Sequence, residues 1–432
     1  MALGGGTFIT QNKVLPGTYH NFISAQRAYL NLSDRGFVAL PIVHDAGKDG
    51  EVVTITAEDF KENTLSLIGY DYTHEKAKPF REIFRNAHTI YAYFLKGSTA
   101  AAATNTFSAA NFKGERGNAL KTVITANVDE PSKFDVQLYL DTILVDEQKA
   151  VASAAALVDN PFVTYKKNAT LAVTAGTPLS GGTNGTVTPV EHQKALDEYE
   201  AYGFNILTCA YADAGIRGLY EAYTKRLRDE VGSKFQVAVF NSTAPNHESV
   251  IDVHNNVDLV YWTAGAEAGC AINASTTNKL YDGEYEVTLT TAKTQSQLTA
   301  LLKAGKFVFH KVGTEVRVLE DINSLVTFTE TKNEDFKLNQ VIRVIDQDAI
   351  DMAHLFNTRY LGKVPNDKAG RVSLWSDVVT HDKEMERLRA IENYNPDETS
   401  VAQGNNKKSV VINKTLTPVV AMTQLYITTV VA

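Results

Sequence analysis

The sequence contains few cysteines and no long apolar run. Only Cys209 and Cys270 occur in 432 residues. Two cysteines cannot build a disulfide framework, so a reducing compartment is expected. No run of apolar residues is long enough to span a bilayer as a helix, which argues against direct membrane insertion. The first residues, MALGGGTFITQNKV, lack a basic stretch followed by an apolar one, so they are not expected to be a secretory signal.

An excess of positive charge is also missing, as are the short motifs of common cofactor sites. The formal net charge is -8, which offers no electrostatic basis for binding nucleic acid. The three glycines at 4–6 have neither a preceding strand nor a following helix, so they do not predict a phosphate-binding loop. The sequence has no HExxH and no paired Cys/His spacing. We therefore expect no metal and no other cofactor.

One group of residues has the composition of a catalytic triad. Asp213 and Ser242 each follow an apolar run that predicts a strand, and His247 and His254 are near in sequence. Active sites of α/β proteins form at the carboxyl ends of strands. Ser242 lies in FNSTAP, however, which is not the G-x-S-x-G elbow of hydrolases. Polar loop residues that cap helices explain the group more simply, so we expect no enzyme and keep an α/β hydrolase as the weaker alternative.

The order of predicted elements indicates an α/β core interrupted by an all-β domain. Residues 25–95 mix strands and helices and form the first part of the core. Short strands separated by loops rich in glycine and threonine predict a β-sandwich or small barrel over 96–189. From 190 to 330, helices alternate with apolar strands, which is typical of a parallel sheet with helices on both faces. Within this stretch HESVIDVHNN favours a short helix, VDLVYWTA a strand and GAEAGCAINAS a helix.

An α+β unit is predicted over 331–407. Apolar residues at helical spacing indicate one long helix between Leu338 and Tyr360. A second helix is predicted from about 373 to 394, and a hairpin that turns at Gly404 follows. The second helix is highly charged, which indicates a solvated face or, alternatively, a docking face for a charged partner. Its charged residues are Lys383, Glu384, Glu386, Arg387 and Arg389.

Both ends of the chain have β-forming sequences. The last residues, QLYITTVVA, have high β propensity and no charge, proline or glycine, which is hazardous on an open sheet edge. This strand could pair within its own domain, cause aggregation, or complete a sheet in a neighbouring molecule. An extended N-terminal arm behind a triple-glycine hinge favours the third possibility. Strands donated from each subunit to the next make heterologous contacts, which produce rings or helical polymers.

The residues expected to act in such an assembly fall into three groups. The N-terminal arm, 1–24, would use Phe8, Ile9, Tyr19 and Phe22. The C-terminal strand would be donated through Leu425, Tyr426, Ile427, Val430 and Val431. Hinges are expected where glycine makes the backbone compliant, at Gly4, Gly5, Gly6 and Gly404.

The order of these segments resembles that of the tail sheath proteins of contractile bacteriophages and tailocins (phage-tail-like bacteriocins), especially those of Gram-positive bacteria. The resemblance covers nearly the whole chain, and its specificity lies in the joint order of the pieces. The stretches that carry it are MALGGGTF, QNKVLPGTYHNFISA, LNQVIRVIDQDAIDMAHLFNTRYLGKVPNDKAGR, VAQGNNKKSVVINKTLTPVVAMTQLYITTVVA, and the β insertion followed by the α/β core.

The resemblance implies a structural subunit that forms stacked six-fold rings around a tail tube. It implies a core of subtilisin-like topology without proteolysis, an insertion domain on the outer surface and a C-terminal domain against the tube. The arms, at 1–24 and 408–432, would join a neighbour's sheet near the hairpin at 398–413. The helix at 373–394 would face the tube. Contraction would drive the tube through the bacterial envelope without a cofactor.

The partners implied by this resemblance are neighbouring sheath subunits, the tail tube protein, and the baseplate and tail terminator proteins. Assembly would take place in the cytoplasm of the bacterial host, and the subunit would end in a virion tail or a released tailocin. A non-contractile shell or fibre protein that assembles through the same strands is the alternative.

Overall fold

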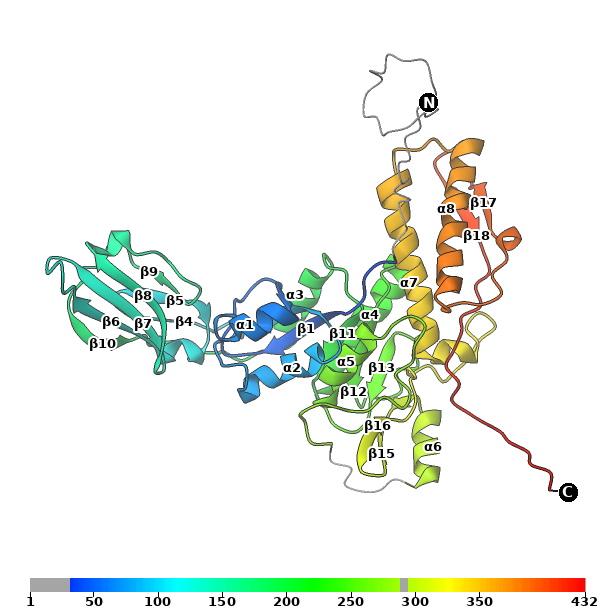
Figure 1. Cartoon of the computed structure of the whole chain (residues 1–432), viewed down its shortest axis with the longest axis horizontal. Helices are drawn as coiled ribbons and strands as arrows, with labels where there is room; N and C mark the ends of the chain where they lie inside the picture. The colour runs from blue at the N-terminus through cyan, green and yellow to red at the C-terminus, as the bar shows by residue number, and fades with distance from the viewer. Residues whose placement is uncertain (1–31, 288–293, 432) are drawn as a thin grey trace, which may run out of the picture.

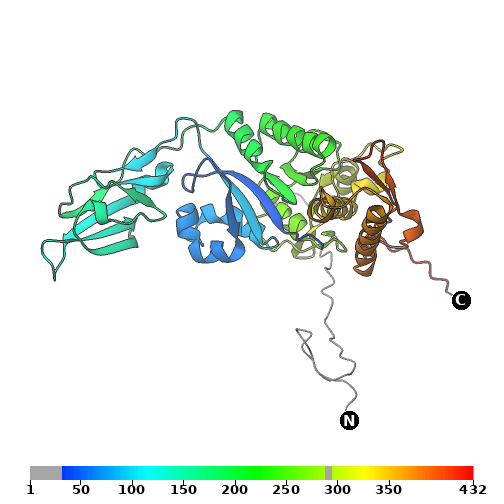
Figure 2. The same ribbon diagram turned by 90° about the horizontal axis from the view of Figure 1, so that it is seen from above.

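The computed structural model describes residues 32–287 and 294–431 and shows an elongated molecule (Figure 1). A β-sandwich lies at one end, an α/β core in the middle, and a unit of two long helices and a hairpin at the other end. Figure 2 shows the same order from above. The residues of the predicted N-terminal arm and its hinge lie outside the described residues: Gly4, Gly5, Gly6, Phe8, Ile9, Tyr19 and Phe22.

The core is built on a seven-stranded sheet with the order β14-β13-β12-β11-β1-β3-β2. Its neighbouring strands run parallel, except that β2 at the edge is antiparallel to β3. The strands are β1 (Phe37–Val43), β2 (Val53–Thr56), β3 (Thr89–Leu95), β11 (Ile206–Cys209), β12 (Gln236–Phe240), β13 (Val250–Val253) and β14 (Lys306–Phe307).

Side-chain alternation along the strands produces a hydrophobic layer on each face of the sheet. In β1, Val38, Leu40 and Ile42 belong to one layer, whereas Ala39 belongs to the other. The first layer is covered by α1 (Ala57–Ile68), α2 (Lys78–Phe84) and α5 (Leu259–Gly269), and the second by α3 (Pro189–Tyr199) and α4 (Ala214–Arg226). The predicted parallel sheet with helices on both faces is therefore confirmed.

Local capping sets several helix ends. The side chain of Thr56 accepts a hydrogen bond from the Asp59 amide at the start of α1, and Gly69 ends that helix with a φ of 75°. Capping boxes start α3 at Thr188 and α6 (Gln295–Lys303) at Thr294. A hairpin of β15 (Phe309–Val312) and β16 (Glu315–Val318) follows α6.

Two predictions in the core are wrong. VIDV forms the buried parallel strand β13 and not a helix, and most of VDLVYWTAGAEAG forms the single helix α5 and not a strand followed by a helix. Because α5 packs between the sheet and α2, most of its side chains are buried and apolar. Periodicity cannot distinguish a helix from a strand when nearly every position is apolar.

The predicted β insertion is a sandwich with its own core. One sheet has the order β10-β6-β7-β8 and the other β4-β5-β9. The first and last residues of the insertion lie next to each other where the sandwich joins the core. There the Gly97 amide donates to the Asn184 carbonyl over 3.0 Å. The strands are β4 (Ala102–Thr104), β5 (Ser108–Lys113), β6 (Leu120–Ala126), β7 (Phe134–Leu140), β8 (Ile143–Val151), β9 (Val163–Tyr165) and β10 (Thr174–Pro178).

The C-terminal unit consists of α7 (Asn339–Leu355), α8 (Lys368–Arg387) and the hairpin of β17 (Ser400–Gln403) and β18 (Val410–Asn413). A π-helical turn extends α7 to Tyr360, as the apolar spacing predicts. The second helix was predicted over about 373–394, but Asp367 caps it at an earlier point by accepting from the Gly370 amide. It ends at Arg387, and Arg389 has a left-handed φ of 62°.

Candidate assembly surfaces

The residues considered as a catalytic triad lie in separate networks. The Ser242 hydroxyl donates to the Glu221 carboxylate. Asp213 caps α4 by accepting from the Ile216 amide over 2.9 Å. The His247 ring lies 3.0 Å from Asp229 Oδ2 and 2.7 Å from Ser249 Oγ. The fold therefore does not bring these candidates together as a nucleophile, base and acid.

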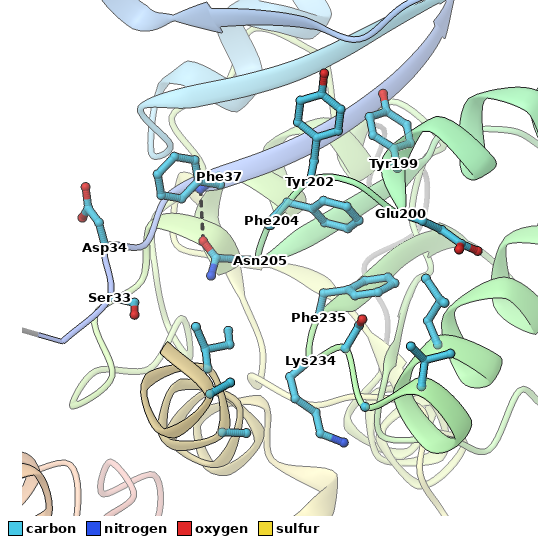
Figure 3. Close-up of a pocket in the computed structure, with 18 residues that line it drawn as sticks. Ser33, Asp34, Phe37, Tyr199, Glu200, Tyr202, Phe204, Asn205, Lys234 and Phe235 are labelled. Carbon is cyan, nitrogen blue, oxygen red and sulfur yellow. Dashed lines mark hydrogen bonds between the residues drawn. The ribbon is translucent and has the colours of Figure 1, made fainter. Parts of the chain in front are cut away.

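A cavity of about 570 Å³ lies where the core meets α7 (Figure 3). Aromatic side chains dominate its wall, including Phe37, Tyr199 and Phe235. The carboxylates of Asp34 and Glu200 lie at opposite sides and do not form a pair. The Asn205 side chain accepts from the amides of Gly36 and Phe37, which fixes the start of β1. The lining provides packing and strand positioning but no acid–base pair.

Among the residues that the structure describes, two tight clusters combine a histidine with two carboxylates, but each already contains its own cation. In the cluster of Asp229, His247 and Glu248, the Lys332 ammonium lies 2.6 Å from Glu248. In the cluster of Asp348, His381 and Asp382, the Lys414 ammonium contacts both carboxylates. These side chains are paired with one another, so we assign no metal to either cluster.

The C-terminal segment 422–431 is extended and exposed. Its path leads away from the body of the subunit (Figure 1). The side chains predicted to enter a donated strand are between 74% and 91% exposed: Leu425, Tyr426, Ile427, Val430 and Val431. Residues 422–431 form no strand with any other part of the described chain. The predicted terminal strand is therefore not formed within the subunit itself. We call 422–431 the distal segment.

The preceding residues, 414–421, are docked against the C-terminal unit, and we call them the root. The Val419 amide donates to the Ala390 carbonyl over 2.9 Å. The Gln340 side chain of α7 receives a hydrogen bond from the Ala421 amide and donates to the Val419 carbonyl. The predicted arm, 408–432, is therefore divided into the end of the hairpin, the docked root and the exposed distal segment.

The β17–β18 hairpin is a two-stranded sheet with open edges. Its register pairs Ser400 with Asn413 and Gln403 with Val410, and no third strand joins it among the described residues. One face packs on the cluster formed by α7 and α8 through Val401, Val410 and Ile412. A small hollow of about 110 Å³ lies beside Val410. Exposed apolar side chains rim this hollow at Leu361 and Val364.

Gly404 lies in the turn of this hairpin. Its amide donates to the Ser409 carbonyl over 2.9 Å, and a Cβ there would approach Ser409 Oγ. The residue expected as a hinge is thus part of the open hairpin, and the root and β18 separate it from the distal segment.

The charged surface formed by α8 and the turn after it is exposed, and part of its charge is neutralised by ion pairs and hydrogen bonds within the surface. Lys383, Arg387 and Arg389 are exposed, whereas Glu384 and Glu386 are half-buried. Arg387 pairs with Glu384 over 2.6 Å, and Glu386 accepts from the Tyr394 amide. The opposite face buries Leu374, Val378 and Met385. The net effect is a solvated, mostly cationic surface.

Buried ion pairs, which the sequence did not single out, join α7 to the core. Arg343 lies 2.5 Å from Glu267 and 3.3 Å from Asp321, and all three side chains are buried. One turn further along α7, Asp346 pairs with the buried Arg228 over 2.6 Å. One feature of the sequence could have indicated these pairs: Arg343 and Asp346 lie within the apolar face of the predicted helix.

None of the helices in the described part of the chain is long and apolar enough to cross a bilayer.

Three domain families of one protein type match successive parts of the sequence. Residues 96–184 match the phage tail sheath protein beta-sandwich domain, residues 185–324 the phage tail sheath protein central domain, and residues 331–432 the phage tail sheath C-terminal domain. The first match coincides with the observed sandwich, and the third contains α7, α8 and the hairpin.

Individual proteins give the same result. The chain is 31% identical over 382 residues to protein XkdK of the phage-like element PBSX of Bacillus subtilis, covering 80% of each. A sheath tail protein of Desulfitobacterium hafniense has a similar structure, with a TM-score of 0.80, 31% identity, and 93% of this chain and 96% of that chain covered. The contracted helical sheath of the anti-feeding prophage shares the fold, with a TM-score of 0.54, 13% identity, and coverage of 96% and 99%.

Proposed function

The chain belongs to the phage tail sheath protein family, and on this premise we propose that it polymerises as stacked hexameric rings around a tail tube and contracts. Contraction drives the tube through the bacterial envelope. The work is stored in the conformation of the assembled sheath, so the subunit needs no cofactor. The structural role follows from the family, and the rings and their contraction are our proposal.

The observation that carries this proposal is an exposed β-forming segment on the same subunit as an open hairpin. In the polymer, the distal segment of one subunit adds as a strand to the β17–β18 hairpin of a neighbour. Fully extended, residues 422–431 reach about 33 Å at roughly 3.3 Å per residue, which is longer than the hairpin strands. Leu425 and Ile427 share one face of such a strand and extend the apolar layer of Val401 and Ile412.

The small hollow beside Val410 offers a place for an apolar side chain of the incoming strand. Its rim includes the exposed apolar side chains of Leu361 and Val364, and burying that surface stabilises the contact. The N-terminal arm, 1–24, adds a second strand in the same way through Phe8, Ile9, Tyr19 and Phe22. Both arms together connect each subunit to its neighbours in a mesh.

A joint of this kind survives a large change in subunit orientation. Backbone hydrogen bonds within an added strand do not depend on how the subunit bodies pack against each other. The extended sheath is held by a kinetic barrier, and the baseplate releases the first ring. Subunits then move largely as rigid bodies and gain new lateral contacts.

The elongated shape supports one orientation of the subunit. The sandwich lies at the opposite end from the C-terminal unit, so we place the sandwich on the outer surface and the C-terminal unit against the tube (Figure 1). The charged face of α8, with Lys383, Arg387 and Arg389, then faces the tube protein. We retain the subtilisin-like topology of the core, the tail terminator as a partner and assembly in the host cytoplasm as parts of the same proposal.

Deletion of residues 424–432 tests the donated strand. We expect a folded subunit that no longer polymerises, because residues 424–431 are exposed in the isolated chain and required only by the neighbour. Electron microscopy of the purified full chain should show tubes or stacked rings with six-fold symmetry, and the truncated protein should show neither. The substitution Ile427→Val keeps the strand-forming character and is the matched control.

The outcomes separate the alternatives. Long tubes from the truncated protein would disprove the donated strand. Shells or fibres without six-fold rings would favour the non-contractile assembly, which uses the same open edges.

A further inference from the structure

We infer that Lys414 is a positioning residue that clamps the root of the C-terminal arm to α7 and α8, so that only the distal segment is free to reach a neighbour. This inference rests on the proposed function, in which the distal segment is donated. In this arrangement the hinge of the arm lies between Ala421 and Met422 and not at Gly404.

Lys414 occupies the position at which the chain leaves the hairpin. It directly follows Asn413, the last residue of β18. Its ammonium lies 2.5 Å from Asp348 Oδ1 on α7 and 2.8 Å from Asp382 Oδ1 on α8. The Lys414 side chain is mostly buried, and Asp382 is fully buried. One side chain of the arm is therefore held by both long helices of the unit.

A second cation completes this cluster. The His381 ring is buried, with Nε2 3.0 Å from Asp351 Oδ2 and Nδ1 3.1 Å from Asp382 Oδ1. Three carboxylates thus face one lysine and one histidine. Withdrawing Lys414 would leave Asp348 and Asp382 with only the histidine as a cation among these groups, and unpaired charge is costly to bury. This cost opposes release of the root.

The contacts after Lys414 continue the attachment. Leu416 packs against the apolar cluster that includes Val344 and Met385. The Glu392 amide donates to the Thr417 carbonyl, and the Val419 and Ala421 amides donate to the Ala390 carbonyl and the Gln340 side chain. Met422 is the first fully exposed residue. The clamp and these bonds set the point and direction from which the distal segment emerges.

A fixed root matters because it shortens the tether. If the arm were free from Lys414 onward, the mobile chain would be nearly twice as long as the distal segment. A longer flexible tether samples more volume, which lowers the effective concentration of the strand at its acceptor. The clamp therefore favours delivery of the strand to one neighbour, beyond any contribution to the stability of its own subunit.

The test compares three variants of the full chain. Lys414→Met removes the charge and keeps much of the side-chain volume, and Lys414→Arg retains the charge. Lys149→Met removes an exposed lysine from β8 of the sandwich, away from the proposed joint, and is the matched control. Hydrogen–deuterium exchange below the assembly concentration reports on the amides of Val419 and Ala421. Electron microscopy above that concentration reports on polymerisation.

We expect the Val419 and Ala421 amides to exchange at least about tenfold faster in Lys414→Met, with far fewer and shorter tubes. Lys414→Arg and Lys149→Met should resemble the wild type in both measurements. If Lys414→Met does not fold, the double variant Lys414→Met/Asp348→Asn relieves the unpaired carboxylate and is measured in its place.

Unchanged exchange in a folded variant without Lys414 would overturn the clamp. Faster exchange with normal tubes would overturn the positioning role. If deletion of 424–432 leaves tube formation intact, the proposed function fails, but the exchange measurement still decides whether Lys414 holds the root.

Discussion

At the scale of single residues, His381 shows how neighbouring charge can override burial. Burial disfavours the charged imidazolium, but hydrogen bonds to Asp351 and Asp382 and the nearby Asp348 outweigh it and raise the pKa of His381 to about 9. The same contacts lower the pKa of Asp351 and of Asp382 against the opposing effect of burial. The ring is therefore charged at neutral pH and helps to hold α8 on α7.

This arrangement predicts a stability that depends on pH. The folded pKa of about 9 lies above the ordinary value of 6.5, so the contribution of His381 is fully present below about pH 6.5 and is lost as pH rises through 9. The difference corresponds to a free energy of unfolding on the order of 3 kcal/mol. Urea unfolding of the wild type and His381→Gln at pH 6, 7.5 and 9.5 should show two stabilities that converge at high pH.

The groups that face His381 come from several elements and define the control. They are Asp348 and Asp351 on α7, Asp382 on α8, and Lys414 at the root. His354→Gln removes a histidine from α7 that is not buried, and it controls for the loss of a histidine side chain as such. A constant difference between wild type and His381→Gln at all three pH values would show that the imidazolium contributes nothing.

At the scale of elements, α7 is the joint between the core and the C-terminal unit. Its first turns carry Arg343 and Asp346 into buried ion pairs with the core, and its last turns pack on α8 and the hairpin. A single helix that is tied to the core by buried ion pairs, and to α8 and the hairpin by both ion pairs and apolar contacts, transmits the orientation of the core to the hairpin. In the proposed assembly, it carries force from the subunit body to the strand joint.

Removing the charge of Arg343 should weaken this joint strongly. Arg343→Met leaves Glu267 and Asp321 buried without their guanidinium, and loss of one partner of a buried pair costs about 3–5 kcal/mol. The matched control is Arg359→Met, which breaks the partly exposed pair with Asp377 and should cost about 0–1 kcal/mol. Chemical denaturation measures both, and equal losses would contradict the role of α7 as a charge-anchored joint.

At the scale of the whole molecule, the sandwich is an insertion whose ends meet. Gly97 and Asn184 are hydrogen-bonded at the neck. The sandwich has its own apolar core, to which the described residues of the α/β part contribute only Ala46 and the half-buried Leu65. Because the two apolar cores are nearly separate, substitutions on the surface of the sandwich can occur without altering the sheet that positions the C-terminal unit.

The sandwich is therefore expected to fold alone. A fragment of residues 97–184 should give a β-type circular dichroism spectrum and one cooperative thermal transition, because its core is nearly self-contained. The complementary chain, with Lys96 joined to Gly185 by a short glycine linker, should retain the core and its assembly. A fragment without a cooperative transition would show that the neck contacts, such as the bond from Arg116 to the Gly69 carbonyl, are required for folding.

The sequence by itself determined the features that depend on near neighbours in the chain. The caps at Thr56, Thr188 and Thr294, the hairpin around Gly404 and the long apolar stripe of α7 all follow from residues within a few positions of one another. The β insertion could be predicted because turn signals separate its strands. The resemblance that led to the family rests on the order of these local pieces.

Only the tertiary structure decided the features in which distant residues meet. Whether the segments within 250–269 form a strand or a helix depends on what packs around them. Likewise, α8 ends at Arg387, where the chain turns to bring Ala390 into an apolar cluster. The pairing of Lys414 with Asp348 and Asp382, and of Arg343 with Glu267, joins positions 32 to 76 residues apart. Such pairs have no local pattern, because a buried charge is stabilised by whichever opposite charge the fold brings within contact.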